Sequence, residues 1–366
     1  MLKAKPAVFQ VKEYHPPLGG RAGMRLDFNE NTAGCSPRVL ARLRSLGLEE
    51  LAKYPEREPV ERCVAERLGV DPEQLLLTNG VDEAIHLLCQ AYLESGDEVL
   101  LPVPTYAMYE IYGAGAGGKI VSVAAGPEFQ FPTEALAAQI APRTRLLAIA
   151  SPNNPTGAVA DEAAVLRLAA AAPQSAILLD EAYFEFYGRT MLSRMAEAPN
   201  LFIARTFSKA YGLAGLRAGV LIGAAKQMRM LRRLASPYNM NAAALACLPE
   251  ALADREYIAD YVAQVRHGRD RLQRELAALG FEFWSSEANF VLFLVGDKRL
   301  PLIEAMRHRG ILVRDRHRDP GCAGCVRITL GTEKQTEAAI AALREVVQEI
   351  GWKPNEQTQR AVMRER

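Results

Sequence analysis

The chain has 366 residues, of which 49% are hydrophobic and 24% are charged, as in an ordinary globular protein. Its 44 Lys and Arg residues nearly balance its 43 Asp and Glu residues, so no overall field favours nucleic acid or an anionic membrane. No apolar run approaches the roughly 20 residues that cross a bilayer, and the N-terminus lacks the apolar stretch of a signal peptide. We therefore expect a cytoplasmic enzyme that recognises anions locally, with no nucleic-acid or membrane partner.

Short apolar runs alternate with longer helical patterns between residues 75 and 221, which is the rhythm of a parallel α/β sheet. The predicted strands are LLLT (75–78), EVLLP (98–102), KIVSV (119–123), RLLAIA (145–150), AILLD (176–180), LFIA (201–204) and AGVLIG (218–223). Amphipathic helices are predicted between several of them, such as 81–93 and 161–172, the second with Asp161 as its N-cap. Because the strands are uniformly apolar, we expect helices to cover both faces of the sheet.

The pattern changes from about Met240 onward, where a long helical region reaches Leu279 and short strands then alternate with helices. The strands predicted there are FEFW (281–284), NFVLFLV (289–295), ILVR (311–314) and VRITL (326–330). The sequence thus predicts an α/β fold with a mostly parallel central sheet, helices on both of its faces, and a smaller α+β C-terminal domain. The predicted divisions are an N-terminal arm (1–35), a large domain (36–240), a small domain (241–351) and a polar tail (352–366).

Four of the predicted strands run directly into polar residues. These polar clusters are 79–82, 151–157, 180–183 and 205–209. Ligands of open α/β sheets bind outside the carboxyl ends of the strands. Because the four clusters should converge on one edge of the sheet, the sequence predicts a functional site there.

Two of these clusters supply groups of opposite charge. Asp180 ends a fully apolar strand, where a carboxylate is costly unless it is paired with a helix start, an arginine or a bound cation. Lys209 follows Thr206 and Ser208, two hydroxyls near a predicted strand-to-helix turn that can donate to a phosphate. Either charge alone has an ordinary structural explanation, so their meaning depends on what surrounds them.

The surroundings point to a phosphorylated ligand. Arg217 lies in apolar, Gly-rich sequence, where an arginine needs an anion. The helix that opens at 80–82 offers its N-terminal amides as an anion site. Together with the lysine and the carboxylate, these groups specify a small phosphorylated and cationic heterocycle. That combination matches pyridoxal phosphate, which requires a lysine and a carboxylate at its pyridinium nitrogen.

Seven segments of the chain carry the motifs of one enzyme family. They are TNGVDEAI (78–85), PTYAMY (104–109), SPNNPTG (151–157), LLDEAY (178–183), RTFSKAYGLAGLRAG (205–219), ILVRD (311–315) and VRITLGT (326–332). With these motifs the chain resembles the fold-type-I aminotransferases, which depend on pyridoxal phosphate, and within them the histidinol-phosphate aminotransferase subfamily. The resemblance runs from about Asp27 to Thr332, and SPNNPTG with the S-K-x(7)-R spacing is highly specific for the superfamily.

The resemblance implies a set of residues around the cofactor ring. Lys209 resembles the lysine that holds the cofactor in a Schiff base, and Asp180 resembles the partner of the pyridinium nitrogen. Asn154 and Tyr183 resemble the pair that hydrogen-bonds the ring O3′, and Tyr106 resembles the aromatic residue that stacks on the ring. We expect Lys209, Asp180 and Tyr183 to act in catalysis, and Asn154 to contact the substrate as well. A desolvated lysine near cations has a lowered pKa, which suits a proton shuttle.

The resemblance also implies a phosphate cup. Val81 and Asp82, through their backbone amides, resemble one side of this cup. Thr206, Ser208 and Arg217 resemble the other side, where two hydroxyls and a guanidinium bind the phosphate oxygens.

Further residues resemble those that contact the substrate and a second subunit. Tyr54 in KYPER resembles a tyrosine that reaches the cofactor phosphate of the neighbouring subunit, which implies a homodimer with composite active sites. Arg327 resembles the arginine that grips the substrate carboxylate. Arg314 resembles the second substrate arginine of the subfamily, and Tyr14 resembles its tyrosine donor.

The implied reaction is transamination of L-histidinol phosphate with 2-oxoglutarate, giving imidazole-acetol phosphate and L-glutamate in histidine biosynthesis. One planar guanidinium can serve both the phosphate ester of one substrate and the carboxylate of the other. The N-terminal arm departs from the subfamily pattern, because it reads EYHPPLGGRAG and because Thr32-Ala33 replaces a typical proline. An aromatic amino acid aminotransferase and a decarboxylase of a phosphorylated amino acid therefore stay open as alternatives.

Two classes outside this family are disfavoured by context. The glycines of 113–118 fit the G-x-G-x-x-G fingerprint of nicotinamide dehydrogenases. They follow a predicted helix and precede a predicted strand, whereas the fingerprint needs a strand before it and a helix after it. A non-catalytic cofactor-binding regulator would need a DNA-binding module, for which an arm of about 35 residues is too short.

The six cysteines are scattered and make no disulfide framework in a chain of this length. Cys322 and Cys325 form a C-x-x-C motif, but neither a second such motif nor a His pair at ligand spacing lies beside it. We therefore predict that they are small residues in a turn before the strand at 326–330, and we expect no metal site.

Overall fold

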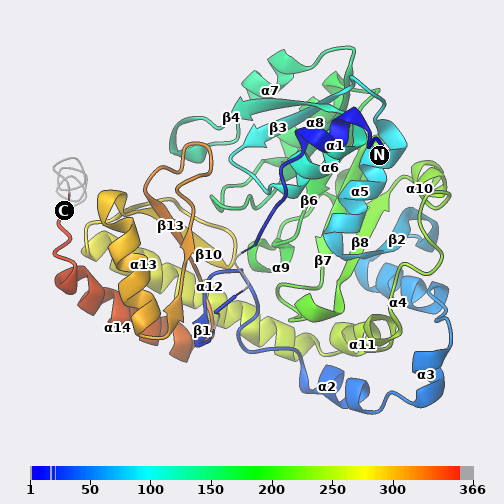
Figure 1. Cartoon of the computed structure of the whole chain (residues 1–366). Coiled ribbons are helices and arrows are strands. Elements are labelled where there is room, and N and C mark those ends of the chain that lie inside the picture. Colours follow the sequence, from blue (N-terminus) through cyan, green and yellow to red (C-terminus); the bar gives the residue numbers. More distant parts are fainter. Residues whose placement is uncertain (1, 17–18, 21, 355–366) are drawn as a thin grey trace.

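The computed structural model describes residues 2–16, 19–20 and 22–354. In this part of the chain, seven strands form the central sheet, in the order β2-β8-β7-β6-β5-β3-β4 (Figure 1). Their bounds are β2 Leu75–Asn79, β3 Glu98–Val103, β4 Lys119–Ala124, β5 Thr144–Ala150, β6 Ala176–Asp180, β7 Leu201–Thr206 and β8 Ala218–Gly223. Each of the seven strands predicted between residues 75 and 223 is confirmed.

The strand directions place the predicted polar clusters on one edge. β4, β3, β5, β6 and β7 are parallel to one another, whereas β8 is antiparallel to both β7 and β2. β2 therefore runs in the same direction as β7, and the carboxyl ends of β2, β5, β6 and β7 lie at the same edge. The mostly parallel central sheet is confirmed.

Helices cover both faces of this sheet. Successive residues of a strand face opposite sides, and here both sides carry apolar residues that need to be buried. Along β5, Leu147 and Ile149 belong to one buried core, whereas Leu146 and Ala148 belong to the other. After the N-terminal arm, the helices up to residue 171 are α2 Pro37–Arg44, α3 Leu48–Ala52, α4 Glu58–Leu68, α5 Gly80–Tyr92, α6 Met108–Ala116, α7 Thr133–Gln139 and α8 Glu162–Ala171. Asp161 caps α8 as predicted, because its Oδ1 accepts from the Ala164 N–H at 2.6 Å.

The C-terminal third builds a second, antiparallel sheet in the order β12-β13-β10-β9. Its strands are β9 Glu282–Phe283, β10 Phe290–Leu294, β12 Arg314–Asp315 and β13 Cys325–Thr329. The remaining helices are α9 Phe184–Tyr187, α10 Ala225–Leu231, α11 Ala242–Ala253, α12 Arg255–Ala278, α13 Arg299–His308 and α14 Glu333–Glu349. Figure 1 shows α13 and α14 beside this sheet, and α12 as a long helix that extends from it toward α11, below the central sheet.

The predicted strand 311–314 is in fact two strands with different partners. β11 (Ile311–Leu312) pairs in parallel with β1 (Met24–Arg25), whereas β12 pairs antiparallel with β13. Val313 lies buried between them, and no polar residue marks the change of partner. This correction also affects the N-terminal arm, which contains the helix α1 (Pro6–Gln10) and contributes β1 to the fold.

The domain boundaries predicted at 36, 241 and 352 stay a prediction. α11 packs against α2 and α4, so the first helix after residue 240 lies with the preceding part of the chain. The predicted polar tail falls almost entirely on residues 355–366, outside the described residues. In the described part of the chain, none of the helices combines the length and the apolar character needed to cross a bilayer.

The glycines at 113–118 have the context predicted for them. Gly113 and Gly115 lie inside α6, Gly117 ends this helix in a left-handed conformation, and β4 follows at Lys119. A helix before the glycines and a strand after them is the reverse of a dinucleotide fingerprint.

Candidate active site

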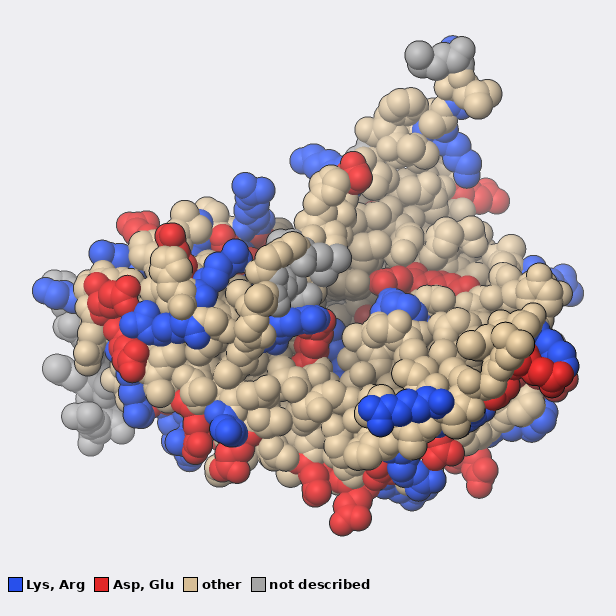
Figure 2. Space-filling model, turned by 60° about the horizontal axis from the view of Figure 1, so that its bottom comes forward, with Lys and Arg blue, Asp and Glu red and all other residues tan. Residues whose placement is uncertain are grey.

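The four predicted polar clusters meet where β2, β5, β6 and β7 end. On the face drawn in Figure 2, Lys and Arg side chains are interspersed with Asp and Glu, and the surface is hollowed near the middle of the view. The two signs of charge are therefore mixed on this face, in keeping with the balanced composition.

Lys209 follows the end of β7 and is held above the sheet edge. Its Nζ donates to the backbone oxygen of Phe28 at 3.2 Å. Burial lowers the pKa of Lys209 to about 8, and the charges of Arg327 and Arg217 act in the same direction, whereas Glu30 opposes them. An amine with this pKa exchanges a proton near neutral pH more readily than an ordinary lysine.

Asp180 ends β6 and is only 4% exposed. Its carboxylate accepts two hydrogen bonds, from the Tyr109 hydroxyl at 2.6 Å and from the Ala182 N–H at 2.9 Å. Burial raises the pKa of Asp180 to about 6, although both hydrogen bonds lower it. Because burial removes water from the carboxylate and so destabilises its charged form, a cation bound beside it would stabilise that form.

Tyr109 is a site residue that the sequence did not reveal. It lies in α6 and is fully buried between the helix and the sheet, with its ring edge-on to Tyr106 at 5.8 Å. The segment PTYAMY contains both tyrosines, but a role was assigned only to Tyr106. The hydroxyl of Tyr106 donates to Asp82 Oδ1 at 3.0 Å, which ties the expected stacking residue to the expected phosphate cup.

Arg217 lies at the centre of the expected phosphate cup. Its Nη2 donates to Asp82 Oδ2 at 3.0 Å and its Nη1 to Ser208 Oγ at 3.5 Å. The Ser208 N–H in turn donates to Thr206 Oγ1 at 3.1 Å. The structure therefore brings together four of the five residues predicted for this cup through hydrogen bonds, and Val81 lies in the first turn of α5.

Gly80 is required by the close approach of Arg217. Gly80 has a φ of +71°, and a Cβ at this position would lie 2.4 Å from Arg217 Nη2. Arg217 therefore approaches the start of α5 so closely that only a glycine fits at position 80.

Tyr183 and Arg327 lie on either side of a segment from the N-terminal arm. Asn29 donates from Nδ2 to the Tyr183 hydroxyl at 2.9 Å. Arg327 donates from Nη2 to the backbone oxygen of Asp27 at 2.8 Å and from Nη1 to Asn154 Oδ1. The sequence assigned no role to Asn29, although the resemblance begins at about Asp27, and its contact with Tyr183 spans 154 positions.

Arg327 is 4% exposed and lies on β13, directly opposite Arg314 on β12. Burial lowers the pKa of Arg327 to about 9, and the charges of Arg316 and Arg314 lower it further. The Arg314 guanidinium lies over the Phe28 ring, 4.8 Å from its centroid. Two cations that face each other across adjacent strands are an arrangement that an anion would stabilise.

Tyr54 and Tyr14 are not brought to this site within one chain. Tyr54 is 78% exposed and its ring lies 4.4 Å from that of Tyr238. Tyr14 is 46% exposed in the segment that follows α1. Their predicted roles stay predictions.

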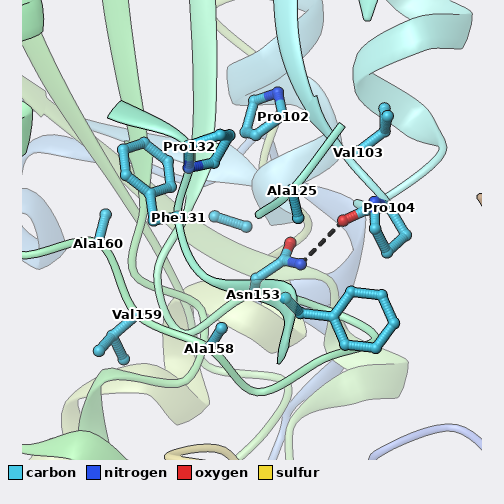
Figure 3. Close-up of a pocket in the computed structure, with 12 residues that line it drawn as sticks. Pro102, Val103, Pro104, Ala125, Phe131, Pro132, Asn153, Ala158, Val159 and Ala160 are labelled. Atoms are coloured by element: carbon cyan, nitrogen blue, oxygen red, sulfur yellow. Dashed lines mark hydrogen bonds between the residues drawn. The ribbon is translucent and has the colours of Figure 1, made fainter. Parts of the chain in front are cut away.

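An apolar pocket lies behind the loop 151–157 (Figure 3). Its lining includes Phe131, Pro132 and Asn153, but none of the residues predicted for the cofactor or the substrate. The Asn153 side chain points toward Pro104 and donates to its backbone oxygen at 2.9 Å, and Nδ2 also donates to Thr156 Oγ1 at 2.9 Å. Asn153 therefore holds the loop that carries Asn154, and the pocket lies apart from the residues predicted for the cofactor and the substrate.

Cys322 and Cys325 are buried free thiols. Cys322 lies in the turn before β13, as predicted, whereas Cys325 is the first residue of that strand. The Cys325 N–H donates to the Cys322 oxygen at 2.9 Å across this turn. Among the residues that the structure describes, no group of three potential metal-ligating side chains is found.

Comparison with known proteins places the chain in a family. The family model for class I and II aminotransferases matches residues 21–343. The histidinol-phosphate aminotransferase of Moorella thermoacetica is 32% identical, over 94% of this chain and 93% of the relative. That of Roseiflexus castenholzii is 36% identical, over 93% of this chain and 97% of the relative.

Solved structures agree with this placement. The crystal structure of histidinol-phosphate aminotransferase from Sinorhizobium meliloti in complex with pyridoxal-5′-phosphate is similar with a TM-score of 0.85. It is 26% identical in sequence, and the similarity covers 96% of this chain and 99% of that one. The chain therefore belongs to the class I and II aminotransferases, and within them to the histidinol-phosphate aminotransferase subfamily.

Proposed function

We propose that this aminotransferase transfers the amino group of L-histidinol phosphate to 2-oxoglutarate, in histidine biosynthesis, with pyridoxal phosphate as its cofactor. The observation that carries the choice of substrate is the pair formed by Arg327 and Arg314 on adjacent strands. Arg327 Nε and Arg314 Nη1 are buried without a hydrogen-bond partner in the described part of the chain. Buried donors of this kind are costly unless an acceptor is supplied, and a phosphate ester supplies several.

The donor set at the sheet edge fits pyridoxal phosphate. A buried carboxylate, Asp180, suits a pyridinium nitrogen, and an amine with a lowered pKa, Lys209, suits a carbonyl carbon. Arg217 lies so close to the first turn of α5 that only a glycine fits at position 80, and a guanidinium beside the first amides of a helix suits a phosphate. When bound, pyridoxal phosphate supplies a carbonyl group that carries the amino group and a ring that accepts electrons.

The side chains of the chain perform the proton chemistry. Asp180 holds a proton at the ring nitrogen, while Tyr109 and the Ala182 amide hold Asp180 in position. Lys209 takes up and returns a proton at the substrate Cα, which its pKa of about 8 permits near neutral pH. Tyr183, oriented by Asn29, would donate a hydrogen bond to the ring oxygen. Asn154, whose Oδ1 accepts a hydrogen bond from Arg327, would hydrogen-bond the same ring oxygen.

The substrate assignment is tested by two arginine variants. Arg327→Ala is expected to slow both half-reactions, because the phosphate ester and the glutamate carboxylate both use this guanidinium. Arg314→Ala is expected to slow the histidinol-phosphate half-reaction selectively, because one bidentate arginine satisfies a carboxylate. The loss of one charge-assisted contact costs about 1.5–3 kcal/mol, so the selective loss should be roughly 10- to 150-fold. Single-turnover measurements of each half-reaction provide the values.

The same assay distinguishes the alternative substrates. Histidinol phosphate, phenylalanine, tyrosine and phosphothreonine are compared in parallel as donors, with 2-oxoglutarate as acceptor. Equal losses in both half-reactions of Arg314→Ala would mean that Arg314 is structural. Turnover of phenylalanine without turnover of histidinol phosphate would identify an aromatic aminotransferase instead, and release of carbon dioxide from phosphothreonine would identify a decarboxylase.

Cofactor binding is expected to depend on pH through Asp180. Below its pKa of about 6 the carboxyl group is protonated and must lose its proton to pair with a pyridinium, so affinity falls as pH falls. Tyr109→Phe removes a hydrogen bond that lowers the pKa of Asp180, so this fall should begin at a higher pH. Cofactor affinity is measured for the cofactor-free wild-type and Tyr109→Phe proteins between pH 5 and pH 8. The ionisation of the cofactor itself affects both profiles equally, so the difference between them reports the protein. Superimposable profiles would refute the role of Tyr109.

A homodimer with composite sites is part of the proposal. Tyr54 and Tyr238 are exposed and in contact, and the exposed Leu48, Leu51 and Leu234 lie near them along the chain. Exposed apolar side chains that gather in this way are typical of a protein interface. We propose that a second copy of the chain covers this surface and that the active site of this copy receives Tyr54.

Mixing two defective variants tests the composite site. Lys209→Ala and Tyr54→Phe proteins, each defective alone, are expected to regain activity when they are unfolded together and reassembled. Random association gives heterodimers in half of the molecules, and each contains one site with both wild-type residues. Activity should therefore approach about a quarter of the wild-type value for the same number of sites. A monomer in analytical ultracentrifugation, with full activity, would end this idea.

The cytoplasm is the location that we propose. All six cysteines are free thiols, including the adjacent Cys322 and Cys325. Reducing compartments preserve such thiols, whereas secreted proteins pair theirs.

A further inference from the structure

The ladder between β12 and β13 directs a third arginine toward the substrate arginines. Arg314 and Arg327 are direct partners across the two strands, so their side chains share one face. The Arg316 N–H donates to the Cys325 oxygen at 3.1 Å, which extends the ladder past Asp315. Because residues two apart on a strand share a face, Arg316 lies on the same side as Arg314. That side carries the contacts of Arg314 with Phe28 and of Arg327 with Asn154.

Each of these arginines leaves a buried N–H group without an acceptor in the described residues. The atoms are Arg314 Nη1, Arg316 Nε and Arg327 Nε. Unpaired donors on buried guanidinium groups are costly, and the cost is removed by an anion that presents several oxygens. A carboxylate presents two oxygens to a site, whereas the phosphate of a monoester presents three.

Asp319 supplies the negative charge that is already present in this cluster. It forms an ion pair with Arg316, in which the two side chains are 25% and 13% exposed. Burial raises the pKa of Asp319, whereas the charges of Arg316, Arg327 and Arg314 lower it. The Asp319 N–H and oxygen bond the backbone of Arg316 and Cys322, so a change of its side-chain charge leaves the turn intact.

The charges of the cluster match a phosphate monoester better than a carboxylate. Three guanidinium groups and one carboxylate leave two positive charges. A phosphate monoester carries about 1.5 to 2 negative charges at neutral pH, and a carboxylate carries one. We propose that Arg316, paired with Asp319, is a specificity-determining residue that favours substrates with a phosphate group over substrates with a carboxylate. This inference rests on the proposed function, because it refines the substrate class of the same site.

Arg316→Gln tests the contribution of the third cation. The ratio of kcat/KM for histidinol phosphate to kcat/KM for glutamate is expected to fall roughly 10- to 100-fold, as for the loss of one charge-assisted contact. Arg316→Lys keeps the charge without the planar fork and should restore part of this ratio. Arg318→Gln is the matched control, because Arg318 is an exposed arginine of the same loop and its loss should leave the ratio unchanged. An unchanged ratio in a folded Arg316→Gln protein overturns the proposal.

Asp319→Asn tests the charge balance from the opposite side. Inorganic phosphate is titrated into each holoenzyme, and its dissociation constant is measured by calorimetry. Asp319→Asn should bind phosphate more tightly than the wild type, Arg316→Gln more weakly, and the double variant more tightly than Arg316→Gln alone. Equal phosphate affinity in all four proteins overturns the proposal, and so does a change of equal size in Arg318→Gln.

The phosphate titration keeps this inference separate from the proposed function. If wild-type enzyme does not turn over histidinol phosphate, the proposed substrate is wrong, but the phosphate affinities still decide the role of Arg316. If histidinol phosphate is turned over and the phosphate affinities do not change, the substrate stands and the role of Arg316 is wrong.

Discussion

Lys209→Ala is expected to abolish turnover and the covalent attachment of the cofactor together. Lys209 is the only lysine placed in the cluster at the sheet edge, where its Nζ contacts the Phe28 oxygen and its pKa is lowered to about 8. Alanine leaves no amine there to bond the cofactor or to move a proton at the substrate Cα. Loss of a positioned proton shuttle alone costs up to roughly 10⁴-fold, so turnover should fall by at least this factor.

Two measurements check the Lys209 prediction. Borohydride followed by intact mass spectrometry should show a mass increment in the wild-type protein and none in Lys209→Ala. Lys226→Ala is the matched control, because Lys226 is an exposed lysine in α10, and it should retain the increment and the activity. A covalent adduct in Lys209→Ala after reduction would place the attachment at another lysine.

Asp180→Asn is expected to lower turnover by roughly 10²- to 10⁴-fold while cofactor stays bound. The asparagine has nearly the shape of the aspartate but no negative charge, so it does not hold a proton at the ring nitrogen. Its amide oxygen can accept from the Ala182 N–H, and the Tyr109 hydroxyl can turn to accept from its amide nitrogen. The local structure should therefore survive, and the loss of activity reports the charge.

Occupancy must be measured alongside turnover for this variant. The absorbance of bound cofactor gives the occupied fraction, and rates are expressed per occupied site. Thermal melting of the cofactor-free proteins checks that folding is retained, and it should show equal or higher stability for Asp180→Asn, because a desolvated carboxyl group has been removed. Near-wild-type rates in a fully occupied variant would falsify the assignment of Asp180.

The elements of the central sheet could be predicted because its strands are short apolar runs bounded by polar residues. The direction of one strand could not. β8 returns antiparallel to β7, because the connecting segment 207–217 contains only the 3₁₀ helix Ala214–Leu216 and no crossover helix. The split of 311–314 between two sheets was also missed, since a buried Val313 gives no sign that the partner strand changes.

The candidate site could be predicted where its residues follow strands, because parallel strands deliver their carboxyl ends to one edge. Its supporting contacts could not, since they join segments far apart in the sequence. Tyr109 reaches Asp180 across 71 positions, and Asn29 reaches Tyr183 across 154. Arg316 was hidden for another reason, because its role depends on which strand its segment pairs with.

The pairing of β1 with β11 sets the order in which the protein can be completed on the ribosome. Met24 is synthesised early, but its partner Ile311 emerges only after most of the chain has been translated. At about 5–20 residues per second, the interval is roughly 15 to 60 s. During this time the segment that carries Phe28 and Asn29 has no strand to anchor it beside Lys209. A nascent chain that stops before residue 311 therefore lacks the strand that anchors this segment, and the lysine pocket is completed late in synthesis.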